Sequence, residues 1–301
     1  MEHWNRNVAA QPAANRKDLA DEVAGGVSTS VNILGSRDAG LSPPELLEAI
    51  AAAGFKYIQI PNDDAEWVSL AGRVSALGLK IGQVHGSLSA SACSLDEQER
   101  TQAVADEAKR MRAVAVYAPC PYVIHYLPRY NDPKRREAFR RSAAELLSLA
   151  TTLQFTIAVE TVPYKPDKDE RYADSGEVAE FVRSFHCDNM RACIDLNHAN
   201  INENLVQAIR NFTGIIACVH ISDNHGRKEE HLLPGEGGID FPSAFKALRE
   251  AGFVGPLNLE ASVSAEDKRD PAEVLSGIRK WLEEQDQLSR PARLPPEKPT
   301  G

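Results

Sequence analysis

The sequence predicts a single-domain α/β protein that folds as a closed (β/α)₈ barrel. Short apolar runs alternate with longer amphipathic stretches along the chain, and eight such pairs occupy about 260 residues. An open, doubly wound sheet would usually have fewer units and a glycine-rich first turn, and no G-x-G-x-x-G pattern follows the first apolar run. In a closed barrel the active site lies at the C-terminal ends of the strands, so functional residues are expected there.

The apolar runs are short and rich in Ile and Val, which is typical of parallel strands buried on both faces. The strands are expected at Val27–Ile33, Lys56–Pro61, Leu79–His85, Tyr122–Tyr126, Phe155–Glu160, Ala192–Asp195, Ile215–Ile221 and Leu257–Glu260.

The amphipathic stretches between them carry helix start and stop signals. Ser42, Asp132 and Asp270 each precede a proline in the first turn, and glycine ends several of the stretches. The helices are expected at Pro43–Ala53, Ala65–Leu77, Asp96–Ala115, Pro133–Thr151, Ser175–Ser184, Asn204–Arg210, Pro242–Ala251 and Pro271–Glu284.

Composition predicts an ordinary soluble protein with loosely held ends. The 34 Lys+Arg against 43 Asp+Glu give a formal charge of −9, and no apolar run is long enough to span a membrane, so a cytoplasmic location is expected. We expect a polar N-terminal tail over 1–25, the barrel over 26–285 and a proline-rich tail over 286–301. Five widely spaced cysteines without a C-x-x-C pair indicate reduced thiols.

The charge balance disfavours a nucleic-acid partner without excluding one. One basic run, between Arg129 and Arg141, is interpreted as a solvated helix face. A homo-oligomer is an open expectation, because the sequence does not fix the number of subunits.

Six successive predicted strands end in residue types that bind metals. The chain has only eight histidines, of which His85, His125, His198 and His220 belong to these strand ends and His231 to the loop after the seventh strand. The candidate ligands are His85, His125, Glu160, Asp195, His198, His220, His231 and Glu260.

Carboxylates that share one site cannot all ionise without a compensating cation, so Glu160, Asp195 and Glu260 predict a divalent metal. Together with His220 they form an oxygen-rich set that suits Mn²⁺, Co²⁺ or Mg²⁺. The additional imidazoles favour Zn²⁺ or a multinuclear cluster, and the number of ions stays open.

The order Glu160, Asp195-x-x-His198, His220 and Glu260 at the ends of strands five to eight resembles the xylose isomerase-like TIM-barrel superfamily. That superfamily contains sugar isomerases and epimerases as well as apurinic-site endonucleases. The string from His220 to Asp240, with an arginine and a Pro-Gly-x-Gly loop after the histidine, looks most like the sugar phosphate isomerase/epimerase branch.

In the epimerase branch the resemblance implies one divalent ion on Glu160, Asp195, His220 and Glu260. The two glutamates would also transfer the proton, through an enediolate of a small sugar or sugar derivative. The equivalents of His198 and Arg227 would hold substrate oxygens.

The endonuclease branch implies a different use of the same barrel mouth. His85, His125, His198 and an acid-x-His pair, here Glu229-x-His231, would join the four central ligands around three zinc ions. The alternative function is therefore a multinuclear-zinc phosphodiesterase, and a non-catalytic binding protein is disfavoured because a binder needs no ligand set of this density.

Several flanking features carry two interpretations each. The backbone amides of 235–238 either receive a phosphate or sugar hydroxyl or form a tight glycine turn. The loop 161–173, with Lys165, Lys168 and Arg171, either closes over a substrate or is only a connection. Trp67 either lines the pocket or packs in a helix. Cys193 and Cys218 are expected to alternate away from the ligands as core thiols.

Overall fold

The structure is a computed structural model, and the residues it describes are 29–32, 41–62, 69–163, 165, 172–261 and 270–289. Both predicted tails, except for 286–289, lie outside these residues, as do Trp67, Lys168 and Arg171. No helix among the described residues is long and apolar enough to cross a membrane.

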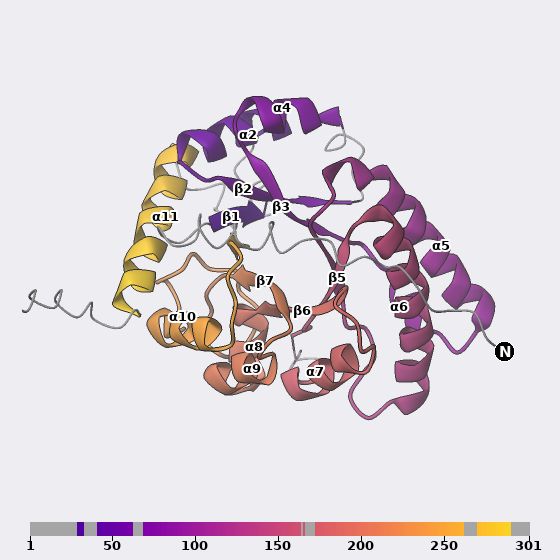
Figure 1. The fold of residues 1–301 in the computed structure, drawn as a ribbon. Coiled ribbons are helices and arrows are strands. Elements are labelled where there is room, and N and C mark those ends of the chain that lie inside the picture. The colour runs from indigo at the N-terminus through magenta and orange to yellow at the C-terminus, as the bar shows by residue number, and fades with distance from the viewer. Residues whose placement is uncertain are drawn as a thin grey trace, which may run out of the picture.

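Eight parallel strands close into a barrel in the order in which they occur along the chain, as the sequence predicts (Figure 1). The barrel is closed because the first strand pairs with both the second and the last. The strands are β1 (Thr29–Asn32), β2 (Tyr57–Pro61), β3 (Lys80–His85), β4 (Pro121–His125), β5 (Thr156–Glu160), β6 (Met190–Asp195), β7 (Ile216–Ile221) and β8 (Leu257–Leu259).

Helices surround the barrel, and side-chain caps fix where several of them begin (Figure 1). The side chains of Asp96, Asp132, Asp174, Asp240 and Asp270 accept hydrogen bonds from first-turn amides, which satisfies donors that have no partner within the helix. The helices are α2 (Pro43–Ala52), α4 (Ala71–Ala76), η2 (Ala90–Cys93), α5 (Glu97–Ala113), η3 (Ala115–Tyr117), α6 (Pro133–Leu153), α7 (Ser175–Arg183), α8 (Leu196–Asn202), α9 (Leu205–Asn211), α10 (Phe241–Glu250) and α11 (Pro271–Leu288).

The helix predictions differ from the structure most at the three points that follow. The sequence interpretation missed α8, which follows β6 without a connecting loop because Asp195 ends the strand and caps the helix at the same time. Helix α6 runs to Leu153 and stops where Gln154 adopts a left-handed conformation. Helix α11 continues beyond Glu284 to Leu288. The short helices η2 and η3 were also not predicted, and the first residues of the predicted helix Ala65–Leu77 lie outside the described residues.

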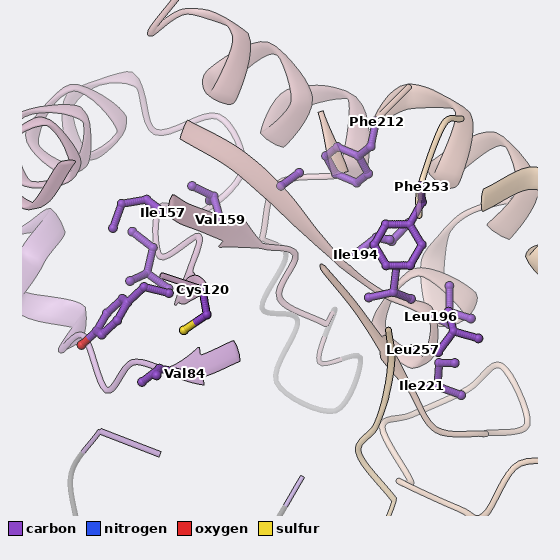
Figure 2. Packing of buried hydrophobic residues seen from close by; sticks show 14 of the residues in the cluster. Val84, Cys120, Ile157, Val159, Ile194, Leu196, Phe212, Ile221, Phe253 and Leu257 are labelled. Atoms are coloured by element: carbon purple, nitrogen blue, oxygen red, sulfur yellow. The ribbon is translucent and has the colours of Figure 1, made fainter. Parts of the chain in front are cut away.

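The core has two parts because side chains alternate along each strand. Ile157 and Val159 of β5 point outward and pack under the helices together with residues such as Ile194 and Phe212 (Figure 2). The intervening residues point inward, and the small interior cluster contains Val123, Ala158, Cys193 and Cys218.

This alternation corrects one expectation. Cys193 and Cys218 are buried core thiols, but they do not alternate away from the ligands. Each precedes a ligand, Asp195 or His220, by two residues and therefore shares its inward face, one layer deeper in the barrel.

The turn after β3 is packed tightly against a buried carboxylate. Glu107 is fully buried and accepts hydrogen bonds from the Tyr122 hydroxyl at 2.6 Å and from the Asn62 amide at 2.8 Å. A Cβ atom at Gly86 would lie 2.6 Å from Glu107 Oε1 and 2.7 Å from the Val123 carbonyl oxygen. The residue after His85 therefore has to be glycine for this strand end to keep its position.

We expect Gly86→Ala to destabilise the protein by about 1 to 3 kcal/mol, because neither the fixed carboxylate nor the backbone can move aside easily. Urea unfolding of the variant and the wild type measures the difference. Gly277→Ala is the matched control, since a Cβ atom there meets nothing within 4 Å inside α11 and should stabilise by about 0.5 to 1 kcal/mol. Equal stabilities of Gly86→Ala and the wild type would contradict the packing argument.

Candidate metal centre

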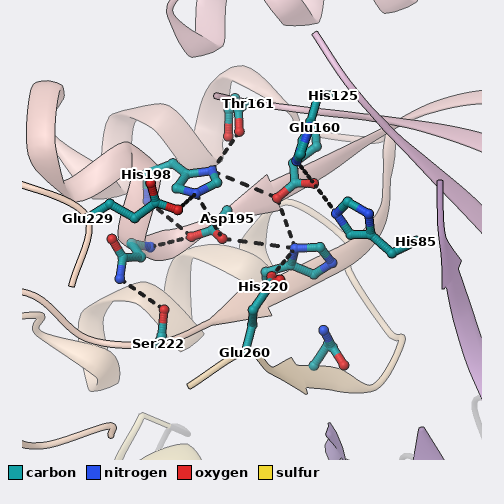
Figure 3. Close-up of polar contacts among 12 residues, drawn as sticks. His85, His125, Glu160, Thr161, Asp195, His198, His220, Ser222, Glu229 and Glu260 are labelled. Carbon is teal, nitrogen blue, oxygen red and sulfur yellow. Dashed lines mark hydrogen bonds and ion pairs between the residues drawn. The ribbon is translucent and has the colours of Figure 1, made fainter. Parts of the chain in front are cut away.

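The C-terminal ends of the strands bring all nine predicted ligands into one mouth. Figure 3 labels all of them except His231. The strands β3 to β6 end in His85, His125, Glu160 and Asp195, and His220 is the second-last residue of β7. Glu260 follows β8, His198 lies in α8, and Glu229 and His231 lie in the loop after β7. Three groups of these residues account for all nine, and within each group the ligand atoms lie within 4.8 Å of one another. These groups are Glu160–Asp195–His220–Glu260, His85–His125–Glu160 and His198–Glu229–His231.

The central group consists of three carboxylates around one imidazole nitrogen. His220 Nδ1 lies 2.7 Å from Glu260 Oε2, 2.9 Å from Glu160 Oε1 and 3.9 Å from Asp195 Oδ2. His220 and Asp195 are fully buried and Glu160 nearly so, whereas the Glu260 side chain keeps 16% exposure. This group therefore sits at the bottom of the mouth, with Glu260 facing the opening.

Two flanking groups extend the centre on either side. On one side, His85 Nε2 and His125 Nε2 lie 3.2 and 3.3 Å from the same atom, Glu160 Oε2. Glu160 thus presents one oxygen to this pair and the other to the central group.

On the other side, Glu229 Oε1 lies 3.2 Å from His198 Nε2 and 2.8 Å from His231 Nε2. His198 Nε2 is also 3.6 Å from Asp195 Oδ2, which links this group to the central one.

Backbone carbonyls orient three of the imidazoles. His85 Nδ1 lies 2.8 Å from the Gly86 oxygen, His198 Nδ1 2.7 Å from the Thr161 oxygen and His231 Nδ1 2.8 Å from the Glu260 oxygen. A carbonyl can only accept, so each Nδ1 carries a proton and donates it. In all three rings Nε2 makes the shortest contact with a carboxylate, at 2.8 to 3.2 Å.

The carboxylates and imidazoles shift one another's protonation strongly. Burial alone would lower the pKa of His198, but the nearby charges of Asp195, Glu160 and Glu229 outweigh it and raise the pKa to about 10. In the same way Glu229 raises the pKa of His231 to about 9 against the effect of burial. Burial would raise the pKa of Glu260, but the charge of His220 lowers it to about 2.

Asp195 shows most directly that the central group fits a cation. Burial raises the pKa of Asp195, so ionisation there requires a positive neighbour. Its Oδ1 accepts hydrogen bonds from the amides of Asn197 and His198, whereas its Oδ2 is buried with no hydrogen-bond partner among the described residues. An oxygen held in this way is a suitable ligand for a divalent ion.

The sequence interpretation left Cys193 out of the site. Its thiol belongs to a further group of neighbouring ligand atoms with Glu160 and His220, one layer below the carboxylates. Burial raises the pKa of the Cys193 thiol far above its ordinary value, which opposes the thiolate form that binds metals. The alternation of side chains along β6 is the signal that could have placed Cys193 beneath Asp195.

The loop after β7 carries Arg227 at the rim of the mouth. Arg227 is exposed and lines a depression of about 650 Å³ with His225, Lys228 and Glu230, outside the ligand groups. Of the lysines and arginine expected in the loop 161–173, only Lys165 is among the described residues.

The glycine turn of the same loop encloses an anion of the protein itself. Asp223 is buried, and its carboxylate accepts hydrogen bonds from the amides of Asn224, Gly235, Gly237 and Ile239 at 2.8 to 3.1 Å. A Cβ atom at Gly237 would lie 2.4 Å from Asp223 Oδ1. The interpretation that these amides receive a substrate phosphate or hydroxyl is therefore wrong for Gly235 and Gly237, and the tight-turn interpretation is correct.

The basic run lies on α6 apart from Arg129, and its side chains of Arg135, Arg136 and Arg141 lie beside acidic side chains. Arg141 lies 2.8 Å from Glu97, and Arg136 lies 3.4 Å from Glu177. This pairing agrees with a helix face in contact with its neighbours and solvent.

Comparisons with known proteins give a consistent answer. A sequence profile of the family described as "Xylose isomerase-like TIM barrel" matches residues 47–285. "L-ribulose-5-phosphate 3-epimerase UlaE" of Escherichia coli O1:K1 is 25% identical over 162 residues, which is 54% of this chain and 54% of that protein. The aligned part thus spans about half the length of such curated relatives.

Solved structures agree in fold. An L-ribulose 3-epimerase superimposes with a TM-score of 0.73 at 20% identity, covering 87% of this chain and 95% of that one. The IOLI protein "with a binding zinc atom" superimposes with a TM-score of 0.69 at 18% identity, covering 87% and 98%. At these identities the likeness establishes the barrel and its topology.

We expect the metal-free protein to lose stability as the pH rises from about 7 to 10. The folded pKa values of about 10 for His198 and about 9 for His231 exceed the value of about 6.5 in an unfolded chain. Their stabilisation is complete below about pH 6.5 and disappears as the pH passes through the two folded values.

Urea unfolding after chelation, at pH 6, 8 and 10, measures this effect. His198→Gln should show a shallower decline, whereas His186→Asn, an exposed position outside the cluster, should decline like the wild type. A free energy of unfolding that stays constant or increases between pH 6 and 10 would contradict the raised pKa values of His198 and His231.

Proposed function

The chain belongs to the xylose isomerase-like TIM barrel family, and we propose that it is a divalent-metal-dependent isomerase or epimerase of a small sugar or sugar derivative. The observation that carries the proposal is the central group, in which Glu160 and Glu260 approach His220 Nδ1 at 2.9 and 2.7 Å. The epimerase names of several relatives agree with this chemistry.

Glu160, Asp195, His220 and Glu260 are the proposed metal ligands. Three carboxylates and one imidazole suit Mn²⁺, Co²⁺ or Mg²⁺. When bound, such an ion would polarise a substrate carbonyl and an adjacent hydroxyl, which acidifies the C–H bond between them.

Glu160 and Glu260 are the proposed proton-transfer residues. They come from β5 and from the residue after β8, so they approach the central group from different sides of the barrel mouth. One carboxylate would remove the proton from the substrate carbon to give an enediolate, and the other would return a proton to the same or the neighbouring carbon. Against the effect of burial, the nearby positive imidazoles hold the pKa values of both groups below the ordinary glutamate value, so both are ionised at neutral pH.

Two further residues are proposed to bind the substrate. His198 has its Nδ1 engaged by the Thr161 carbonyl, so its Nε2 is the nitrogen directed into the mouth, where it can meet a substrate oxygen. Arg227 stands exposed on the rim loop and can approach hydroxyl or anionic groups of a substrate from above.

The two flanking groups favour a second candidate function, a multinuclear-zinc phosphodiesterase. His85–His125–Glu160 and His198–Glu229–His231 are each three-ligand sets that suit Zn²⁺, and an epimerase with one ion has no need of them. In that case the bound ions would activate water and stabilise the leaving oxygen of a phosphate ester. The net charge of −9 disfavours a nucleic-acid substrate, because both molecules are negatively charged.

We expect Glu260→Gln to keep the fold and to abolish turnover, with kcat at least about 10³-fold lower, because the amide cannot accept the substrate proton. The assay incubates a panel of ketoses and ketose phosphates in deuterated water and follows deuterium at the carbon beside the carbonyl by NMR. Glu250→Gln, which changes an exposed carboxylate at the C-terminal end of α10 outside the ligand groups, is the control and should retain activity. Full exchange activity in Glu260→Gln would discard the two-carboxylate mechanism.

Metal content decides between the two candidate functions. We expect about one Mn²⁺ or Co²⁺ per chain for the epimerase and about three Zn²⁺ for the phosphodiesterase, measured on freshly purified protein by plasma mass spectrometry. His231→Ala should leave the first stoichiometry unchanged and reduce the second by about one ion. Hydrolysis of an abasic-site oligonucleotide, together with three zinc ions, would replace the proposal by its alternative.

A further inference from the structure

His220 differs from His85, His198 and His231 in the partner of the ring nitrogen that points away from the central carboxylates. His85, His198 and His231 each donate the Nδ1 proton to a backbone carbonyl. In His220 the ring is reversed, because Nδ1 faces the carboxylates and Nε2 points down into the barrel. There it lies 2.7 Å from the side-chain amide of Gln83.

Gln83 belongs to a buried set of three carboxamides on the floor of the site. Its amide contacts that of Gln59, the residue opposite it in the neighbouring strand β2. Asn258 Nδ2 donates to Gln59 Oε1 at 3.0 Å, and Asn258 lies opposite His220 in the pairing of β7 and β8. All three amides are at most 2% exposed, so water does not compete for their hydrogen bonds.

The chemistry of the ring decides which end of the Gln83 amide must face it. An imidazole that presents the lone pair of Nδ1 to a cation keeps its proton on Nε2. That proton needs an acceptor, and the Gln83 amide can provide one by placing Oε1 rather than Nε2 against the ring, through rotation about its last bond.

The same rotation also bears on the hydrogen bonding of Gln59. Gln59 Nε2 is buried without a hydrogen-bond partner among the described residues. If Gln59 and Asn258 turn together with Gln83, the two protons of Gln59 Nε2 reach Gln83 Oε1 and Asn258 Oδ1. A buried donor without a partner thereby gains two acceptors, which removes an unfavourable desolvation cost.

We propose that Gln83 is a positioning residue for the metal centre: its amide oxygen accepts the Nε2 proton of His220 and so directs Nδ1 toward the cation, while Gln59 and Asn258 hold that amide in place. The inference rests on the proposed function only in taking the central group as a metal site. It concerns a side chain that touches neither the substrate nor the ion.

Two variants of similar size separate an acceptor from a packing role. Gln83→Glu keeps an acceptor that can receive protons from both His220 Nε2 and Gln59 Nε2, whereas Gln83→Met fills the space without a strong acceptor. We expect Gln83→Met to weaken Co²⁺ and Zn²⁺ binding by about 10- to 100-fold in calorimetric titrations. Gln83→Glu should bind within about threefold of the wild type, and Gln207→Met, a surface amide of α9, should not change binding.

Nitrogen-15 NMR of the His220 ring provides a readout that does not depend on activity. In the Zn²⁺-loaded wild type we expect the proton on Nε2 and the metal on Nδ1, and in Gln83→Met a mixture of ring states. Equal metal affinity of Gln83→Met and the wild type, a metal-loaded ring with its proton on Nδ1, or a Gln83→Glu variant as weak as Gln83→Met would each overturn the inference. A wild-type chain that binds no metal would instead overturn the metal dependence of the proposed function, and with it the role assigned to Gln83.

Discussion

The carboxylate of Glu160 is the point on which the geometry of the barrel mouth depends. One of its oxygens meets His85 and His125, and the other meets His220. A buried carboxylate in the company of Asp195 and Glu260 would be unstable without positive charge, and the surrounding imidazoles supply that charge in the metal-free protein. In the metal-free protein the histidines therefore supply the positive charge that a bound cation would otherwise provide.

The barrel makes this concentration of charge structurally tolerable. Strand alternation separates an apolar outer layer, which packs under the helices, from an inner layer that ends in polar ligands at the mouth. The rim adds its own supports, since Asp223 ties the glycine turn back to the loop that carries Glu229 and His231. Stability and ligand placement thus come from different faces of the same strands.

The sequence was sufficient for those features that depend on local pattern. The eight strands and the ligands at their ends follow from apolar runs and from the rule that parallel strands end at one face, so Glu160 and His220 could be brought together before any coordinates.

Features that depend on contacts between distant segments could not be predicted in this way. Only the fold shows that Asp223 occupies the amides of the glycine turn or that Gln83 lies beneath His220. The error over Cys193 is of another kind, because counting by two from Asp195 places it on the inward face. Helix α8 was not predicted because no loop separates it from β6: Asp195 is both the last residue of the strand and the N-cap of the helix. The ends of the strands therefore predict the central group, whereas Glu229 and His231, on which the two proposed functions differ in the number of ions, come from a loop that only the fold brings to it.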